Sequence, residues 1–290
     1  MIGIAAALAA SLAWGASDYM GGIATRRVAV IVVLIGSQGF GLLLVSIVVA
    51  VRGEPPPPFS DLAFAALAGA VGAVGVAMLY RALAIGTMSV VAPLAATGVV
   101  VPVVVGIASG DPTPPLLLIG IVTVMAGVML ASREQDVAMQ ETHSGHPNPT
   151  AHRQAIAMAL AAALAFGIFF VALDRGSEND FLWSVLAQRT TSVTLLLIVA
   201  LAIVRPRPGQ WRLEWGIILA LGFADAAANV LFAFSTTQGA LSVAAVLSSL
   251  FPVWTVLLAH WLLHERLVTM QRVGVVLTLI GVAIVAALGS

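Results

Sequence analysis

The sequence contains no cysteine and no lysine, and few charged residues of any kind. Charged residues make up 9% of its 290 positions, whereas hydrophobic residues make up 60%. Soluble globular proteins have about 25% charged residues, so this composition excludes that class. The absence of cysteine excludes disulfide bonds, thiolate metal sites and cysteine nucleophiles. The basic residues, all arginine, equal the acidic ones in number, and zero net charge does not favour nucleic acid or an anionic surface as a partner.

Apolar runs of about 20 residues recur along the chain, which is the length that a helix needs to cross a bilayer. The mean hydropathy of +1.07 agrees with this pattern. The first ten residues lack the basic region of a cleavable signal peptide, so they are interpreted as part of a span. We expect an all-α polytopic membrane protein with ten spans, near residues 3–20, 29–51, 62–85, 88–109, 115–132, 154–174, 181–204, 213–237, 240–263 and 269–288.

The two halves of the chain resemble each other at a spacing of about 153 residues. The matches are Asp61 with Glu214, Gly69 with Gly222, Gly86 with Gly239, Ser89 with Ser242, Gly120 with Gly274, Gly127 with Gly281, and Trp14-Gly15 with Phe166-Gly167. We therefore predict a first five-helix repeat at 1–132, a polar linker at 133–153 and a second repeat at 154–290. Because five is an odd number, the second repeat must be inverted in the bilayer. Inverted repeats are typical of transporters, whose substrate site lies near the midplane.

Two stretches carry a family resemblance. WGASDYMGGIATRR near the start, and the run from Leu241 to Val285 with its mid-helix proline and Gly-spaced last helix, resemble the drug/metabolite transporter superfamily, EamA type. The resemblance covers essentially the whole chain. It implies a ten-helix exporter or permease of small metabolites, with the YddG-like amino-acid exporters among its branches. The sequence GDPTPP at 110–115 departs from the Gly-Glu-Arg hairpin of that family.

Polar and aromatic residues inside the expected spans are candidates for the substrate site, because lipid cannot satisfy polar groups. Aromatic rings can hold an apolar or cationic part of a substrate, while hydroxyl and amide groups orient its polar end. The alternative for the aromatic residues is core packing or, for tyrosine, anchoring at the membrane interface. The predicted substrate-binding residues are Trp14, Asp18, Tyr80, Phe166, Phe169, Asn229, Ser248, Ser249 and Trp254.

Helix-interior prolines add a second kind of polar group. Pro252 cannot donate to the carbonyl of Ser248, which is therefore available to a ligand. The alternative is a packing kink whose backbone groups are satisfied by neighbouring helices.

Three charged residues within the spans need a partner or a function. Asp225 and Arg189 are expected either to form a structural bridge between helices or to provide a proton-binding site at Asp225. Asp18 is expected at the end of the first helix, just before a turn at Gly21-Gly22. At that position Asp18 is expected at the rim of a central cavity. It is either solvated or paired with the arginines that follow, or it acts as a gate or a proton site.

Arginine positions also predict an orientation. If the amino terminus is cytoplasmic, the cytoplasmic loops hold only Arg52 and Arg175, and the other loop arginines lie on the opposite side. The positive-inside rule therefore favours an outside location for both termini.

The leading functional hypothesis is a secondary transporter, not an enzyme, that exports small polar metabolites such as amino acids. We expect no cofactor and no metal, since HWLLHER lacks the HExxH order, and the absence of a P-loop argues against ATP-driven transport. The alternatives are a channel and a membrane-embedded enzyme that acts on lipid intermediates through His260, His264 and Glu265. The expected location is the inner (cytoplasmic) membrane. The expected partners are the bilayer and a small substrate, and the expected state is a monomer or weak homodimer.

Overall fold

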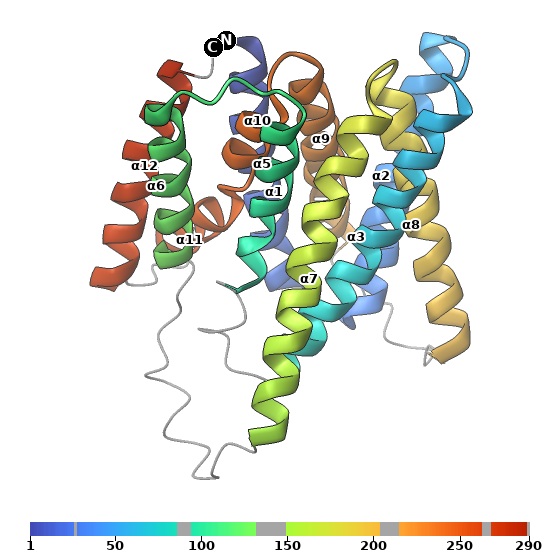
Figure 1. The fold of residues 1–290 in the computed structure, drawn as a ribbon. Coiled ribbons are helices and arrows are strands. Elements are labelled where there is room, and N and C mark those ends of the chain that lie inside the picture. Colours follow the sequence, from blue (N-terminus) through green and yellow to red (C-terminus); the bar gives the residue numbers. More distant parts are fainter. Residues whose placement is uncertain (26–27, 86–93, 132–148, 204–214, 263–267, 289–290) are drawn as a thin grey trace.

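The computed structural model describes residues 1–25, 28–85, 94–131, 149–203, 215–262 and 268–288. All regular elements in these ranges are helices, arranged as one bundle with both chain termini at the same end (Figure 1). They are α1 (Ile2–Thr25), α2 (Val30–Arg52), α3 (Phe59–Ile85), the 3-10 turn η1 (Thr97–Val99), α5 (Val100–Ala108), α6 (Pro115–Ala131), α7 (Pro149–Gly176), α8 (Phe181–Ile203), α9 (Trp215–Thr237), α10 (Leu241–Ser248), α11 (Phe251–Leu262) and α12 (Thr269–Leu288).

Seven helical segments of the described chain are long and apolar enough to cross a bilayer. They are α2, residues 59–79 of α3, α7 from residue 153, α8 to residue 202, α9, the α10–α11 pair and α12. The segment 94–108 and α6 are apolar but shorter. Large apolar side chains remain exposed on the outer faces of these helices, for example Leu43, Ile198 and Leu279. Lipid contact accounts for the exposure of these apolar side chains. The backbone needs no partner from the lipid, because an α-helix satisfies its own backbone hydrogen bonds.

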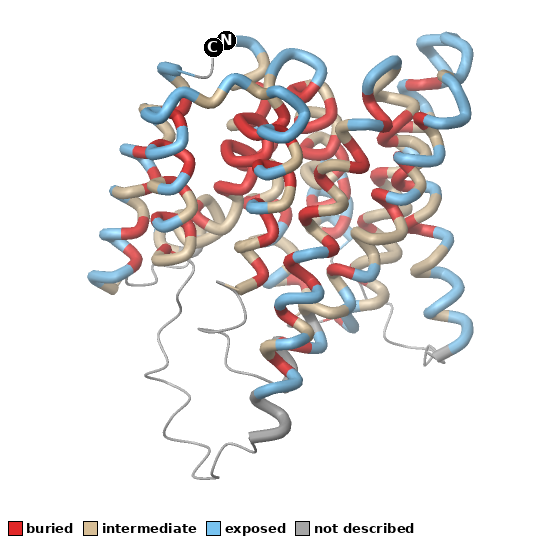
Figure 2. Tube along the Cα trace, in the orientation of Figure 1, coloured by how far each residue is buried: buried red, intermediate tan, exposed pale blue. Residues whose placement is uncertain are grey.

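Buried residues face the interior of the bundle, and exposed ones line its periphery (Figure 2). The pairs in closest contact along their lengths are α3 with α7, α6 with α12, and α1 with α9. Small residues permit this approach: a Cβ at Gly274 or at Gly281 of α12 would collide with the backbone of α6. In lipid, helix pairs are stabilised mainly by dispersion between closely packed backbones, because the hydrophobic effect does not drive helices together there.

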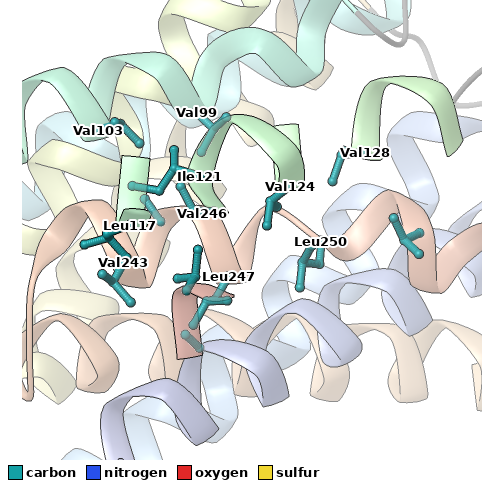
Figure 3. Close-up of a cluster of buried hydrophobic side chains, with 14 of the residues drawn as sticks. Val99, Val103, Leu117, Ile121, Val124, Val128, Val243, Val246, Leu247 and Leu250 are labelled. Carbon is teal, nitrogen blue, oxygen red and sulfur yellow. The ribbon is translucent and has the colours of Figure 1, made fainter. Parts of the chain in front are cut away.

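The helix α10 contacts α1, α5, α6, α7 and α9, and all eight of its residues are buried. Val243, Val246 and Leu247 of α10 meet Leu117 and Ile121 of α6 in one apolar cluster (Figure 3). This cluster also includes residues of α1, α5, α11 and α12, so it joins both ends of the sequence.

The observed helices agree closely with the expected spans wherever the structure describes both, with three differences. First, α1 continues through Gly21-Gly22 to Thr25, so the turn expected there is wrong. Second, α7 begins at Pro149, inside the stretch predicted as linker, whose residues 132–148 lie outside the described chain. Third, the ninth span is interrupted between Ser248 and Phe251, just before Pro252, as a break at this proline predicts.

Candidate functional site

A buried ion pair joins α8 to α9. The guanidinium Nη2 of Arg189 donates to Asp225 Oδ2 at 2.8 Å, and its Nη1 lies 3.5 Å from Gln38 Oε1 on α2. Gly41 of α2 makes room for the arginine, because a Cβ there would press on Nη1. The side chain of Arg189 is 0% exposed and that of Asp225 is 20% exposed. The structure thus pairs the two charges that the sequence singled out, and adds Gln38 as a partner.

Asn229 follows Asp225 by one turn of α9 and is also buried, at 3% exposure. Its Nδ2 donates to the carbonyl oxygen of Asp225 at 2.7 Å. Because a carbonyl can only accept, this bond fixes which end of the amide is the donor. The amide oxygen Oδ1 is left with no hydrogen-bond partner among the described residues. A buried acceptor without a donor is uncommon in folded proteins, so this enclosed oxygen keeps an unused acceptor position.

Asp18 lies within α1, seven residues before the helix ends at Thr25. The expected position at a helix end is therefore wrong, because α1 does not stop at the glycine pair. Asp18 is exposed, and it lies on α1 between Trp14, whose ring contacts Phe232, and Gly21, which lies against Leu221. These two contacts place Asp18 at the level of Asp225 on the neighbouring helix α9. A carboxylate within a membrane-spanning helix requires a wet or polar surrounding. The pairing with Arg26 or Arg27 stays a prediction, because both arginines lie outside the described residues.

An aromatic cluster lies beside these charges. The ring of Trp14 on α1 is 5.8 Å from Phe170 of α7, 5.9 Å from Phe232 of α9 and 6.3 Å from Phe251 of α11. Phe169 extends the cluster, with its ring 5.5 Å from that of Phe170. Four helices from both parts of the chain therefore meet around one partly exposed indole.

Two predicted phenylalanines fill spaces that glycines leave on α3. Phe169 lies against Gly72 and Phe166 against Gly75. This placement agrees with the packing alternative for both rings, and their contact with a substrate stays a prediction.

The remaining predicted polar contacts have partners within the protein. The indole Nε1 of Trp254 donates to Ser11 Oγ at 3.0 Å, and Ser248 Oγ donates to the carbonyl of Ala7 at 3.3 Å. Ser249 Oγ donates to the carbonyl of Val246 at 2.8 Å. The bonds of Trp254 and Ser248 hold the broken helix α10–α11 to α1, whereas that of Ser249 is local, and a substrate would have to compete with all three.

Several predicted residues cannot be placed. The side chain of Tyr80, together with His264 and Glu265, lies outside the described part of the chain. Within the part that is described, no group of three or more histidine, aspartate or glutamate side chains is arranged to hold a metal ion.

The predicted substrate-binding residues do not include Phe170, Phe232, Phe251 or Gln38, although Phe170, Phe232 and Gln38 lie inside the expected spans. For Phe232 a signal was present, since it follows Asp225 by seven residues and so shares its helix face. Phe170 adjoins two selected rings, and Gln38 is a polar residue inside an apolar run, but sequence alone does not show which of them face the pair.

At the end of the bundle that carries the termini, polar contacts connect the two parts of the chain. Arg52 Nη1 donates to Asp180 Oδ2 at 2.7 Å, and Asn179 Nδ2 donates to Asp61 Oδ2 at 2.8 Å. The Asp111 carboxylate accepts from the backbone N–H of Ser242 at 2.9 Å, at the start of α10. The loops α2–α3 and α5–α6 are thereby tied to the second half of the chain at this end.

A cavity of about 450 Å³ also opens at this end. It lies between the loop of Ser109 and Asp111 on one side and Ser235, Gln238 and Ala240 on the other. It does not include the aromatic cluster or the Arg189–Asp225 pair.

The model of the EamA-like transporter family matches residues 1–133 and 153–287, which is nearly the whole chain. The chain belongs to the EamA-like transporter family. A solved crystal structure, described only as that of a protein, matches with a TM-score of 0.80 at 17% sequence identity. The match covers 99% of this chain and 97% of that one, and at this identity it shows the shared fold alone. No match was found among curated proteins. As an EamA-like transporter with seven long apolar helical segments, the protein is a multi-pass membrane protein of the drug/metabolite transporter superfamily.

Proposed function

We propose that this EamA-like protein is a secondary transporter that exports small polar metabolites, amino acids among them, across the inner (cytoplasmic) membrane. It works by alternating access between two inverted five-helix repeats, 1–132 and 154–290, which together provide ten spans and are joined by the linker 133–153. The observation that carries the proposal is the meeting of Asp18, Asn229 and the Arg189–Asp225 pair with an aromatic cluster inside apolar helices. Ionisable residues inside a membrane bundle mark substrate or ion pathways by default.

The glycine contacts support the inverted repeat. Gly15 of α1 lies against Trp254 Cβ and the carbonyl of Phe251, and Gly167 of α7 lies against Val101 Cβ and the carbonyl of Gly98. Trp254 and Phe251 are each 153 residues after Val101 and Gly98, so both contacts follow the repeat spacing. The same exchange relates Gly69, which lies against the Gln188 carbonyl, to Gly222, which lies against that of Ser37.

The directions of the helices also favour inversion. The helix α1 starts at the end of the bundle that carries the termini, whereas α7, at the corresponding place in the second half, ends there (Figure 1). Related halves of opposite orientation can exchange their conformations, which opens the site alternately to each side.

The test is flux through purified protein in liposomes. We expect uptake of at least one radiolabelled compound from a panel of amino acids and related small polar metabolites, with saturation and competition by unlabelled substrate. Liposomes without protein are the control. Ohmic conductance without saturation would favour a channel, and no flux across the panel would remove the proposal. An imposed pH gradient that leaves the flux unchanged would exclude proton coupling.

A further inference from the structure

The charges of the candidate site do not balance, and this bears on what the proposed transporter binds. Asp18 on α1 and Asp225 on α9 provide two carboxylates, while Arg189 provides one guanidinium, bonded to Asp225. With both aspartates ionised the three groups carry one net negative charge. Ionisable groups inside a membrane bundle pair with one another or with a ligand, so a cation is the complementary partner.

The accessible groups are the negative ones. Arg189 is 0% exposed, whereas Asp225 is partly exposed and Asp18 is exposed. A ligand that approaches α1 and α9 therefore meets carboxylates first and cannot reach the guanidinium unless Asp225 moves. In this site the described part of the chain offers a ligand carboxylate no accessible cationic side chain.

The unpartnered amide oxygen of Asn229 points to the same ligand chemistry. It is nine-tenths or more buried, and its orientation is set by the bond from Nδ2 to the Asp225 carbonyl. Asn229 lies on α9 between Asp225 and Phe232, and Phe232 contacts Trp14, so this part of the α9 surface is turned toward α1. The oxygen is a hydrogen-bond acceptor, as the carboxylates are. The acceptors of Asp18, Asp225 and Asn229 are suited to a ligand with several N–H donors, whereas the unpartnered Nε of Arg189 is enclosed.

The aromatic cluster distinguishes an organic cation from an inorganic one. Trp14 precedes Asp18 by one turn of α1 and is partly exposed. Its contacts with Phe170, Phe232 and Phe251 hold the ring in place. The face of an indole ring attracts ammonium groups and packs against the carbon atoms next to them. A small metal ion has no such carbon atoms and gains little from an aromatic surface.

We propose, resting on the proposed transport function, that the site recognises a protonated organic amine. Asp18 and Asn229 Oδ1 accept its N–H groups, and Trp14 covers its apolar part. Amines without a carboxylate bind better than the corresponding zwitterionic amino acids, because a ligand carboxylate would face Asp18 and Asp225.

The first experiment needs no variant. Thermal unfolding of the purified protein is measured with three compounds of similar size: 2-phenylethylamine (cation), phenylalanine (zwitterion) and 3-phenylpropionate (anion). A ligand that binds only the folded state raises its unfolding temperature. We expect the largest rise with the amine and none with the anion. An equal or larger rise with the zwitterion or the anion overturns the proposal, as does a rise with sodium chloride alone that matches the amine.

The second experiment places the amine at Asp18. Asp18→Asn is expected to raise the amine concentration for half-maximal effect at least about tenfold, because one charge-assisted hydrogen bond is lost. Asp18→Glu is expected to retain binding, and Glu54→Gln, in the exposed loop after α2, to leave it unchanged. A folded Asp18→Asn protein with unaltered amine binding overturns the assignment.

The two proposals fail in different ways. Saturable flux of amino acids without any preference for amines refutes amine recognition and leaves the transporter in place. Amine binding to a protein that transports nothing in liposomes refutes the transporter and leaves the site in place.

Discussion

The guanidinium of Arg189 and the carboxylate of Asp225 meet at 2.8 Å between α8 and α9, with the arginine wholly enclosed and the aspartate partly exposed. The arginine has no other carboxylate within salt-bridge distance in the described residues, and its Nε has no hydrogen-bond partner there. The pair therefore joins a buried, fixed charge to a group that a ligand can reach.

We expect loss of one member of this pair to destabilise the protein strongly. Arg189→Met leaves Asp225 without its partner, at a cost of about 3–5 kcal/mol in the free energy of unfolding. The double variant Arg189→Met/Asp225→Leu removes both charges and is expected to recover much of that loss. Unfolding in detergent, followed by circular dichroism, measures both effects. Equal stability of the single variant and the unmodified protein would contradict the prediction.

Exchanging the two charges separates a structural role from a transport role. If the pair only holds α8 against α9, the protein with Asp at 189 and Arg at 225 should fold and transport. Flux in liposomes is the measurement. A folded but inactive exchange variant would place Asp225 or Arg189 in the transport step.

Two glycines of α1 provide a matched test of helix packing. A Cβ at Gly15 would collide with Trp254 Cβ and the carbonyl of Phe251, whereas a Cβ at Gly22 meets nothing within 4 Å. Gly15→Ala is therefore expected to destabilise by about 1–3 kcal/mol through overpacking. Gly22→Ala is expected to be neutral or slightly stabilising, because alanine has the higher helix propensity. Similar unfolding temperatures for both variants would mean that α1 and α11 are not in the close contact observed.

The polar contacts near the termini predict a place to lock the protein. Arg52 and Asp180 connect the two parts of the chain at that end. The protein has no cysteine, so Arg52→Cys/Asp180→Cys can be joined selectively by a short, cleavable dithiol cross-linker. Under alternating access this link should abolish flux, and its cleavage should restore it.

The control for the cross-link is Arg175→Cys/Glu178→Cys. These residues lie at the same end, but both belong to the second half of the chain. This link should leave flux unchanged. Full flux through the linked 52–180 protein would show that this end does not open.

The distribution of arginine predicts the orientation of the bundle. Arg81, Arg153 and Arg272 of the described chain lie at the end away from the termini, at the end of α3 and the starts of α7 and α12 (Figure 1). The positive-inside rule then places that end in the cytoplasm. A reporter fused after Ser290 should be active only when it requires export. Activity of a cytoplasm-specific reporter alone would contradict the prediction.

The site residues show how far sequence reasoning reached. Asp18, Asn229 and the pair of Arg189 with Asp225 stand out because a charged or amide group is costly in lipid, so it is visible against an apolar background. Phe170, Phe232 and Phe251 do not stand out, because an aromatic ring is equally suited to lipid, core or substrate. Only their ring contacts with Trp14 separate these possibilities.

The helix ends also include features that the sequence predicts and features that only the structure shows. Gly21-Gly22 would predict a turn in water, yet α1 continues to Thr25, because an unbonded backbone is more costly in a bilayer than a glycine in a helix. The break before Pro252 was predictable, since a missing N–H is a local property. That Trp254 and Ser248 then bond to α1 was not, because it depends on which helix lies opposite.

Sequence by itself determined the membrane character, the position of most helices and the residues whose charge requires a partner. These properties follow from the cost of placing each residue and each backbone group in lipid, which is set locally. Tertiary structure alone decided that Arg189 faces Asp225, that Asp18 lies at the level of Asp225 on the neighbouring helix, and that Asn229 keeps an unpartnered oxygen. Those relationships join α1, α8 and α9, which are distant in the chain, and they depend on small residues such as Gly41 that let the helices approach.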